Sequence, residues 1–164
     1  MENQKNDNLN LLEAVVQNTE MGKNTLEQIV PMTDDTQFKA ELLRQRGYGV
    51  SLALMAVKPK ISLVSCQIRY EEMRVAGTTP RATDPAHHNK IIDQIVSNLG
   101  VLEASGMFDE IALYDRSQTC LFPREGAGDS AEEALCTILF GPWTSEERRH
   151  YNELKAKLEQ LRRK

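Results

Sequence analysis

The apolar residues of the chain change from a helical to a strand-like spacing and back again. Between residues 9 and 30 they recur mostly every three to five positions, which predicts one amphipathic helix ended by Pro31. A second helix is predicted through FKAELLRQR, with Thr33 or Asp34 as N-cap and Gly47 as its stop. The first 50 residues are therefore expected to be mainly helical.

The stretch YGVSLALMAV at residues 48–57 has a different pattern. It is short, apolar and bounded by Gly47 and Pro59, which predicts a strand buried on both faces in a parallel sheet. A helix is expected from about 62 to 76 and a longer one from about 85 to 105, which Gly106 ends. The longer helix carries five apolar residues on one stripe: Ile91, Ile92, Ile95, Leu99 and Leu102.

Two further strands and two further helices are predicted in the remainder of the chain. EIALYDR and CLF have strand character, and SAEEALCTIL and TSEERRHYNELKAKLEQLRRK have helical character. Thr144 and Glu147 match the capping box at the start of the last helix. Helices alternating with buried strands indicate an α/β fold.

Composition limits the classes of function. A length of 164 residues suits one domain with appendages, and a net charge of -4 with pI ≈ 5.5 argues against nucleic-acid binding. The longest apolar run, LALMAV, is too short to span a membrane, and the polar start has no secretory signal, so we expect a cytoplasmic protein. Cys66, Cys120 and Cys136 form no C-x-x-C pair and are expected to be buried, reduced thiols.

Two local motifs do not predict a site. EMGKNT at residues 20–25 has Gly-Lys, but Gln17 and Asn24 occupy the positions where a P-loop needs Gly and Ser or Thr, and no strand is predicted before it. A helix surface is the better interpretation. His87 and His88 are adjacent, so they cannot be metal ligands at i and i+4, and backbone hydrogen bonds at a helix start are expected instead. No metal site is predicted.

Two arginines flank a chain break in RYEEMRVAGTTPRATDPAHHN. Arg69 lies on a predicted helix beside Glu71 and Glu72, so a solvated ion pair of little energetic value is the alternative to a functional role. Arg81 lies in a loop before a helix start, where a guanidinium can bind phosphate with two hydrogen bonds. The residues alone leave both interpretations open.

The run RGYGVSLALMAVKPKISLVSCQIRYEEMRVAGTTPRATDPAHHNKIIDQIVSNLGVLEASGMFDEIALYDR resembles the C-terminal half of the zeta toxin family. These are bacterial toxin-antitoxin kinases that phosphorylate UDP-N-acetylglucosamine. The shared features are the Gly-Tyr strand entry, the Ala-Val-x-Pro strand end, the Arg-Tyr-Glu helix, the Arg-Ala-Thr loop with a following His, and the closing Phe-Asp-x-Ile-x-Leu-Tyr-Asp-Arg. The resemblance covers residues 37–122 and implies part of a P-loop-kinase-like α/β domain, with parallel strands, helices and added terminal helices.

The resemblance also implies roles for individual residues. Arg69 and Arg81 match the two family arginines that contact ATP phosphates, and His88 is expected to support them. ATP and Mg²⁺ are the cofactors that the resemblance implies. The chain lacks the family's P-loop, magnesium ligand and catalytic base, so the alternative that it uses no cofactor stays open. The resemblance is to a phosphotransferase, and whether the chain alone is an enzyme stays open. Weak binding of a nucleotide or another phosphate anion is the expected minimum.

Three segments follow from this comparison: residues 1–36 as a helical N-terminal segment, 37–122 as the zeta-toxin-like half domain, and 123–164 as a linker and helical tail. NLLEAVVQNTEMG also resembles, more weakly, the first helix of small bacterial ferritin-like proteins, but no Glu-x-x-His motif accompanies it. An antitoxin or a second copy of the chain is an expected partner. The alternative from a different class is a non-enzymatic helical interaction module or a gene remnant.

Overall fold

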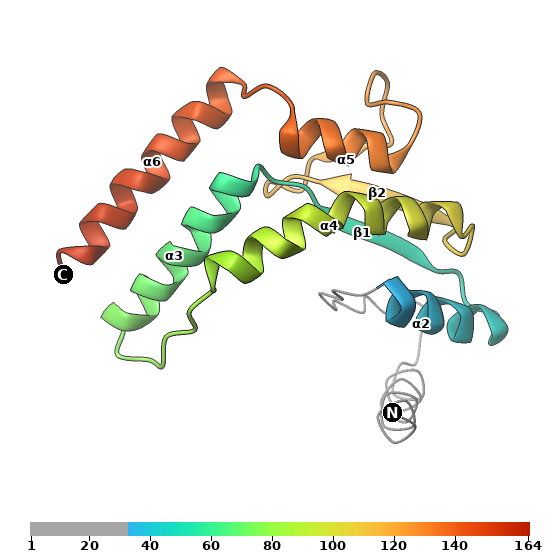
Figure 1. The fold of residues 1–164 in the computed structure, drawn as a ribbon, viewed down its shortest axis with the longest axis horizontal. Coiled ribbons are helices and arrows are strands. Elements are labelled where there is room, and N and C mark those ends of the chain that lie inside the picture. Colours follow the sequence, from blue (N-terminus) through green and yellow to red (C-terminus); the bar gives the residue numbers. More distant parts are fainter. Residues whose placement is uncertain (1–32) are drawn as a thin grey trace.

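The computed structural model describes residues 33–164. The predicted helix between residues 9 and 30 and the EMGKNT motif lie outside the described residues. The described chain has the element order α2, β1, α3, α4, β2, β3, α5, α6 (Figure 1). This order confirms the predicted α/β class.

Helix α2 (Thr33–Gln45) begins and ends close to the predicted positions. Gly47 follows it with φ +82, a left-handed conformation that glycine adopts without steric cost. The backbone N–H of Gly47 donates to the carbonyl of Arg44, which completes the last turn. The chain then enters β1 (Ser51–Met55).

The sheet has the order β1-β2-β3. β1 runs parallel to β2 (Glu110–Tyr114), with Ser51 opposite Glu110 and Met55 opposite Tyr114. β3 (Cys120–Phe122) pairs with β2 in the antiparallel sense. All three predicted strands are therefore confirmed, and the parallel pair places the ends of β1 and β2 at the same edge of the sheet.

The prediction that β1 is buried on both faces was wrong. Ser51, Ala53 and Met55 are exposed, and Leu52 and Leu54 are only half-buried. The reason is that, within residues 33–164, no helix covers the face that carries these three residues. In the same range β1 pairs with β2 only. A run of apolar residues thus forms a strand at the edge of the described sheet.

Two long helices connect β1 to β2. Helix α3 (Pro59–Val75) begins three residues before its predicted start, because Pro59 occupies the first helical turn, where its missing N–H costs nothing. Helix α4 (Pro85–Ala104) begins after Asp84, whose carboxylate accepts a hydrogen bond from the N–H of Ala86. Gly106 follows α4 as predicted, with φ +63.

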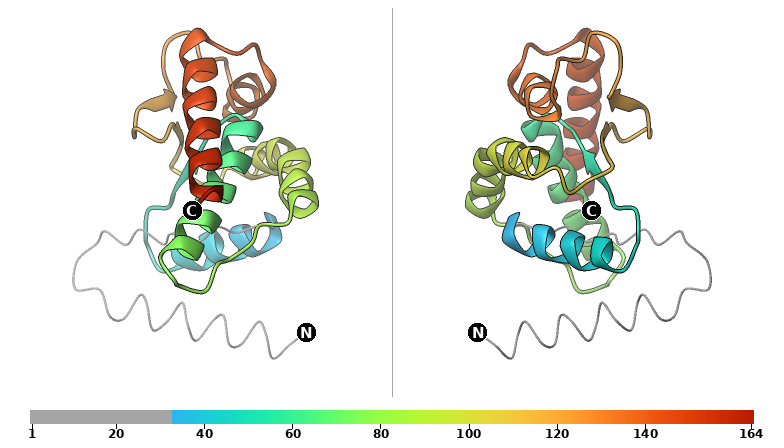
Figure 2. Two further views of the ribbon diagram at one scale, coloured as in Figure 1. Left: turned by 90° about the vertical axis from the view of Figure 1, so that its left-hand side faces the viewer. Right: turned by 90° about the vertical axis from the view of Figure 1, so that its right-hand side faces the viewer.

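The C-terminal region folds into helices α5 (Ala131–Phe140) and α6 (Ser145–Arg162). Thr144 and Glu147 form the predicted capping box, in which the Thr144 Oγ1 accepts from the Glu147 N–H at 3.1 Å and Glu147 Oε2 accepts from the Thr144 N–H at 2.7 Å. Helix α6 lies beside α3 and runs in the same direction (Figures 1 and 2). The tail is therefore packed onto the half domain.

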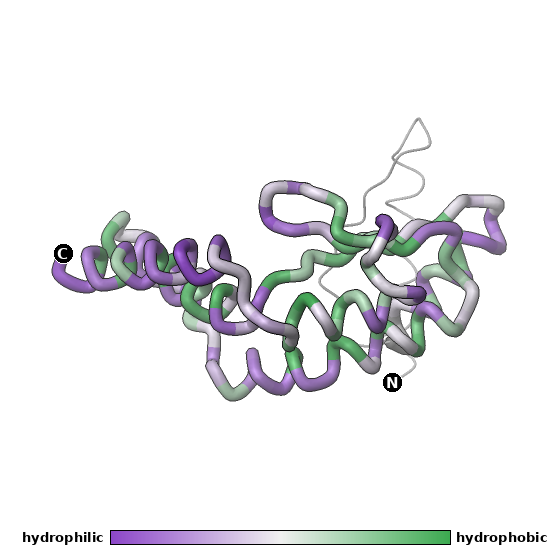
Figure 3. Tube along the Cα trace, turned by 90° about the horizontal axis from the view of Figure 1, so that it is seen from above, coloured by the Kyte–Doolittle hydropathy of each residue, from purple (hydrophilic) through white to green (hydrophobic). Residues whose placement is uncertain are grey.

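Two separate groups of buried apolar residues hold the elements together. One lies between the sheet, α4 and α5, and its fully buried side chains include Leu99, Leu113 and Leu135. The other lies between α3 and α6 and contains Val64, Ile68 and Leu158, with Tyr151, Leu154 and Leu161 packed against it. Figure 3 shows apolar positions concentrated around the strands and hydrophilic positions along most of α6.

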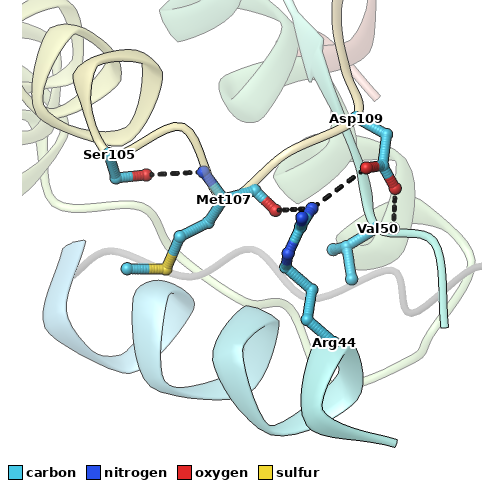
Figure 4. Close-up of polar contacts among 5 residues, drawn as sticks. All are labelled: Arg44, Val50, Ser105, Met107 and Asp109. Carbon is cyan, nitrogen blue, oxygen red and sulfur yellow. Dashed lines mark hydrogen bonds and ion pairs between the residues drawn. The ribbon is translucent and has the colours of Figure 1, made fainter. Parts of the chain in front are cut away.

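Polar contacts join α2 to the start of the parallel strands (Figure 4). Arg44 Nη1 donates to the carbonyl of Met107 and to Asp109 Oδ1, both at 3.0 Å, and Asp109 Oδ2 accepts from the N–H of Val50 at 2.8 Å. The Val50 backbone hydrogen bond and the Arg44 guanidinium hold the pKa of Asp109 below its ordinary value. This carboxylate thus connects α2, the entry to β1 and the entry to β2.

The prediction of buried thiols was wrong in part. Cys66, Cys120 and Cys136 are all free, but Cys66 and Cys120 are half-buried and Cys136 is exposed. Cys136 lies on the outer side of α5, whereas its neighbour Leu135 points into the core. A step of one residue, about 100° around the helix, therefore separates a core position from a solvent position.

Candidate functional site

Arg69 lies on α3 and Arg81 in the segment 76–84 that returns from α3 to α4 (Figure 1). Both side chains are exposed, and neither forms an ion pair within residues 33–164. This arrangement leaves two guanidinium groups accessible to a ligand.

The carboxylates next to Arg69 are occupied by other cations. Glu71 Oε2 lies 2.6 Å from Arg74 Nε, and Glu72 Oε1 lies 2.7 Å from Lys157 Nζ on α6. Arg162 Nε lies 3.9 Å from Glu71 Oε1. The alternative ion pair of Arg69 with these two glutamates is not formed, because both carboxylates face α6.

Three polar residues of α3 share one side of the helix. With about 100° per residue, Ser62, Ser65 and Arg69 project within an arc of about 60°. The side chains that pack on α6, including Val64 and Ile68, lie on a different side. Arg69 therefore follows the two serines along a polar side of α3 that α6 does not cover.

The Ser62 hydroxyl contacts His88 in the first turn of α4. His88 is buried, and its Nε2 lies 3.2 Å from Ser62 Oγ, while its Nδ1 has no hydrogen-bond partner. The expectation that this histidine bonds the backbone was wrong, since the imidazole reaches a side chain on the neighbouring helix. His88 thus fixes the start of α4, and the end of the Arg81 segment, against α3.

The Ser65 hydroxyl contacts Arg116, which follows β2. Arg116 Nη1 donates to Ser65 Oγ at 2.6 Å, and this hydroxyl donates to the carbonyl of Ile61 at 2.7 Å. A third guanidinium therefore lies one helical turn from Arg69. Sequence reasoning gave Arg116 no role, although its place after a parallel strand and the 62, 65, 69 spacing on α3 are signals that could have found it.

Asp115 shapes the turn that carries Arg116. Its Oδ1 accepts from the Ser117 N–H at 2.8 Å, from the Ser117 hydroxyl at 2.7 Å and from the Thr119 N–H at 2.9 Å. The Ser117 hydroxyl, followed by these backbone groups, lowers the pKa of Asp115. An ionised Asp115 thereby holds the loop in the conformation that directs Arg116 towards α3.

The three predicted site residues are connected only indirectly. In the part of the chain that the structure describes, no hydrogen bond or ion pair joins Arg69, Arg81 and His88 to one another. His88 contacts Ser62, which lies on the same side of α3 as Arg69. Arg81 lies in the segment that leads to α4, the helix that carries His88. That both arginines contact one phosphate group stays a prediction.

Two further kinds of feature, a metal cluster and a membrane-spanning helix, are absent between residues 33 and 164. No group of three or more His, Cys, Asp or Glu side chains there could hold a metal ion. No helix in the same range is both long and apolar enough to cross a bilayer.

The family model described as Zeta toxin matches residues 2–127. This chain belongs to the zeta toxin family. The match begins before residue 37, so it also includes the segment with the weaker ferritin-like resemblance.

Individual relatives agree with this assignment. Toxin PezT of Streptococcus pneumoniae serotype 4 is 38% identical over 110 residues, which are 66% of this chain and 44% of that protein. Toxin zeta of Streptococcus pyogenes is 31% identical over 116 residues, which are 68% of this chain and 40% of the relative. The chain thus spans less than half the length of these relatives.

A solved structure extends the similarity to the fold. A chain from the structural characterisation of the PezAT toxin-antitoxin system of Streptococcus pneumoniae superimposes with a TM-score of 0.71 and 30% sequence identity. The superposition covers 84% of this chain and 54% of the other. The fold is therefore that of part of the PezT toxin, with the P-loop-kinase-like architecture that the sequence predicted.

Proposed function

We propose that this chain is the phosphate-binding half of a zeta-toxin-like phosphotransferase, related to the ATP-dependent kinases that phosphorylate UDP-N-acetylglucosamine. Arg69 and Arg81 contact the phosphates of ATP, and His88 holds the helix that follows Arg81 in place. The observation that carries the proposal is the accessible Arg69, whose neighbouring carboxylates are engaged by cations of α3 and α6.

The chemistry of phosphoryl transfer explains this use of arginine. The transition state spreads negative charge over the γ-phosphoryl oxygens, and positioned cations stabilise it. Guanidinium groups remain charged and can donate two parallel hydrogen bonds to a phosphate. Arg116, held by Ser65 beside Arg69, adds positive charge to the same side of α3. ATP, with Mg²⁺ bound to its phosphates, is the ligand that this arrangement suits.

We further propose that the chain alone does not complete the reaction. The G-x-x-x-x-G-K-[ST] pattern does not occur in its sequence, and within residues 33–164 no cluster of acidic or histidine side chains could hold a metal ion. Arginines that neutralise charge need a positioned nucleophile and metal before they accelerate transfer. An antitoxin is the partner class suggested by the toxin-antitoxin relatives.

A second candidate is a non-enzymatic interaction module. The observation in its favour is a set of large apolar side chains exposed on the described surface: Tyr48, Met55, Val75, Val101 and Phe140. Met55 also lies on β1, at the edge of the described sheet. Exposed apolar groups at a strand edge favour association with another chain.

A kinase assay separates the two parts of the proposal. With ATP, Mg²⁺ and UDP-N-acetylglucosamine, we expect no phosphorylated sugar nucleotide above a no-protein control. Calorimetry on the same protein should show ATP binding in about the millimolar range, weakened by added salt. Product formation abolished by Arg81→Ala would contradict the incomplete site, and ATP binding unchanged in Arg69→Ala and Arg81→Ala would contradict the phosphate-binding role.

A further inference from the structure

An open cavity lined by basic and aromatic side chains lies between the N-terminal parts of α3 and α6. Its volume is about 330 Å³, and it is lined by Lys60, Trp143, Arg148, Tyr151 and Asn152. This is near the lower end of the range for small-molecule sites. Four of the five lining residues lie beyond residue 127, where the family match ends.

The lining residues gather there because α3 and α6 run in the same direction. Contacts near the other end of the pair, such as Arg74 Nη2 donating to the carbonyl of Leu161 at 3.1 Å, fix the alignment of the two helices. Their first turns therefore lie at the same end of the pair (Figure 1). Trp143 comes two residues before the first residue of α6. Arg148, Tyr151 and Asn152 are spaced by three and four residues, so they share one side of α6.

The cavity has a positive and an aromatic wall. Lys60 and Arg148 form no ion pair within residues 33–164, and no carboxylate lines the cavity. By contrast, the adjacent Arg149 forms two ion pairs. Its Nη2 lies 3.8 Å from Glu146 Oε1, and its Nε lies 3.8 Å from Glu153 Oε1. Lys60 and Arg148, which line the cavity, are thus without an ion-pair partner between residues 33 and 164.

The aromatic wall is formed by Trp143 and Tyr151. Their ring centroids are 5.4 Å apart with an interplanar angle of 67°, an edge-to-face arrangement. Lys155 Nζ lies 5.8 Å from the Tyr151 centroid, which adds a third cation nearby. Both rings are half-buried, so part of each remains accessible to a planar ligand.

The start of α3 also favours an anionic ligand. No side chain caps this 17-residue helix, and its first turn contains no acidic residue. The free N–H groups and the helix dipole favour an anion at this end. Backbone, side-chain charge and aromatic surface therefore all suit one kind of ligand.

We propose that this cavity binds a small molecule in which a planar aromatic ring carries an anionic group, as in a nucleoside monophosphate. The ring packs on Trp143 and Tyr151, and the anionic group contacts Lys60 and Arg148. Asn152 supplies a hydrogen-bonding amide. Lys60 projects about 160° around α3 from Ser62, so this site lies on the other side of the helix from Arg69 and is independent of the proposed ATP contacts.

The chain provides its own reporter, because Trp143 is its single tryptophan. Uridine 5′-monophosphate is titrated into the full chain while Trp143 fluorescence is excited at the red edge of the indole band, with uridine and inorganic phosphate as separate probes. We expect a saturable change with the monophosphate and binding weaker by about tenfold or more with either fragment. Added salt should weaken the binding.

Variants of the lining residues test whether the monophosphate binds in this cavity. Arg148→Ala and Lys60→Ala should each weaken binding about three- to tenfold, while Arg149→Ala, which removes the same charge one residue away, should change it less than about twofold. Arg69→Ala with Arg81→Ala should leave the Trp143 response unchanged, whatever their effect on ATP. No saturable response, equal binding of inorganic phosphate, or an equal loss in Arg149→Ala would overturn the proposal.

Discussion

Asp109 joins three segments of the chain with the two oxygens of one exposed carboxylate. It accepts from the Val50 N–H and pairs with Arg44, and these contacts lower its pKa. A lowered pKa in the folded state means that the ionised carboxylate stabilises the fold at neutral pH. That contribution is lost as the pH falls from the ordinary value of 3.8 through the lowered pKa.

Asp109→Asn should therefore reduce the acid sensitivity of folding. The variant is expected to have a lower Tm than the wild type at pH 7 and a smaller drop in Tm between about pH 5 and pH 3. Asp93→Asn, which changes an exposed aspartate on α4, is the control. Parallel Tm curves for the wild type and Asp109→Asn would show that the carboxylate has no such role. Thermal melts followed by circular dichroism provide the measurement.

The site residues were predictable only to the extent that a family motif marks them. Arg69, Arg81 and His88 were named from the resemblance, whereas the contact of His88 with Ser62 joins positions 26 residues apart and is formed only by packing. Arg116 and Ser65 are 51 residues apart and meet for the same reason. Spacing along one helix is visible in a sequence, but contacts between helices and loops are not.

At the scale of the elements, Gly141 determines how α5 leads into α6. Its N–H donates to the carbonyl of Thr137 at 2.9 Å, and its own carbonyl accepts from Nζ of the buried Lys58 at 2.8 Å. A Cβ at this position would collide with the Thr137 carbonyl oxygen, which is backbone and cannot rotate away. The turn therefore requires glycine even though its φ is negative.

Gly141→Ala should destabilise the protein by about 1–3 kcal/mol. The matched control is Gly100→Ala in the interior of α4, where the new Cβ would meet only the end of the flexible Glu132 side chain. That change should be neutral or stabilising by up to about 1 kcal/mol, because alanine favours helix. Equal stability of the two variants in urea unfolding would refute the collision at Gly141.

The strand β1 shows the limit of prediction from hydrophobic pattern. SLALM was correctly predicted as a parallel strand, but its second face is exposed within the described residues. An apolar composition indicates that a strand is suited to burial. It does not indicate which helices or strands pack against it. The helix ends marked by Thr144 and Gly47 were predicted more closely, since caps of this kind act locally.

Association through β1 follows from this exposure. Met55 is 55% exposed on β1, at the edge of the sheet in residues 33–164, so we expect the chain to self-associate at tens of micromolar, roughly. Met55→Lys should shift the equilibrium towards monomer, because a charge on an edge strand opposes pairing. Val101→Lys, at a similarly exposed apolar position on α4, should have the smaller effect, because Val101 does not lie on β1. A monodisperse wild-type monomer by light scattering would contradict this expectation.

At the scale of the whole molecule, two buried apolar clusters of different size contribute to the free energy of unfolding. Leu135 is fully buried between the sheet and two helices, whereas Leu158 lies in the smaller cluster between α3 and α6. Leu135→Ala should cost about 3–5 kcal/mol, and Leu158→Ala about 2–3 kcal/mol because a helix pair can close part of the gap. Urea unfolding measures both. A larger loss in Leu158→Ala would show that the helix pair is the main stabilising unit.

The central claim is that Arg69 and Arg81 bind one phosphate group together, and a double-mutant cycle tests it most directly. Inorganic tripolyphosphate, which has no ring for the Trp143 cavity, is titrated by calorimetry into the wild type, Arg69→Ala, Arg81→Ala and the double variant. We predict that each single variant weakens binding about tenfold, and that the double variant is weaker by far less than the product of the two effects. Losses that multiply independently, or single variants that bind like the wild type, would contradict the shared phosphate site.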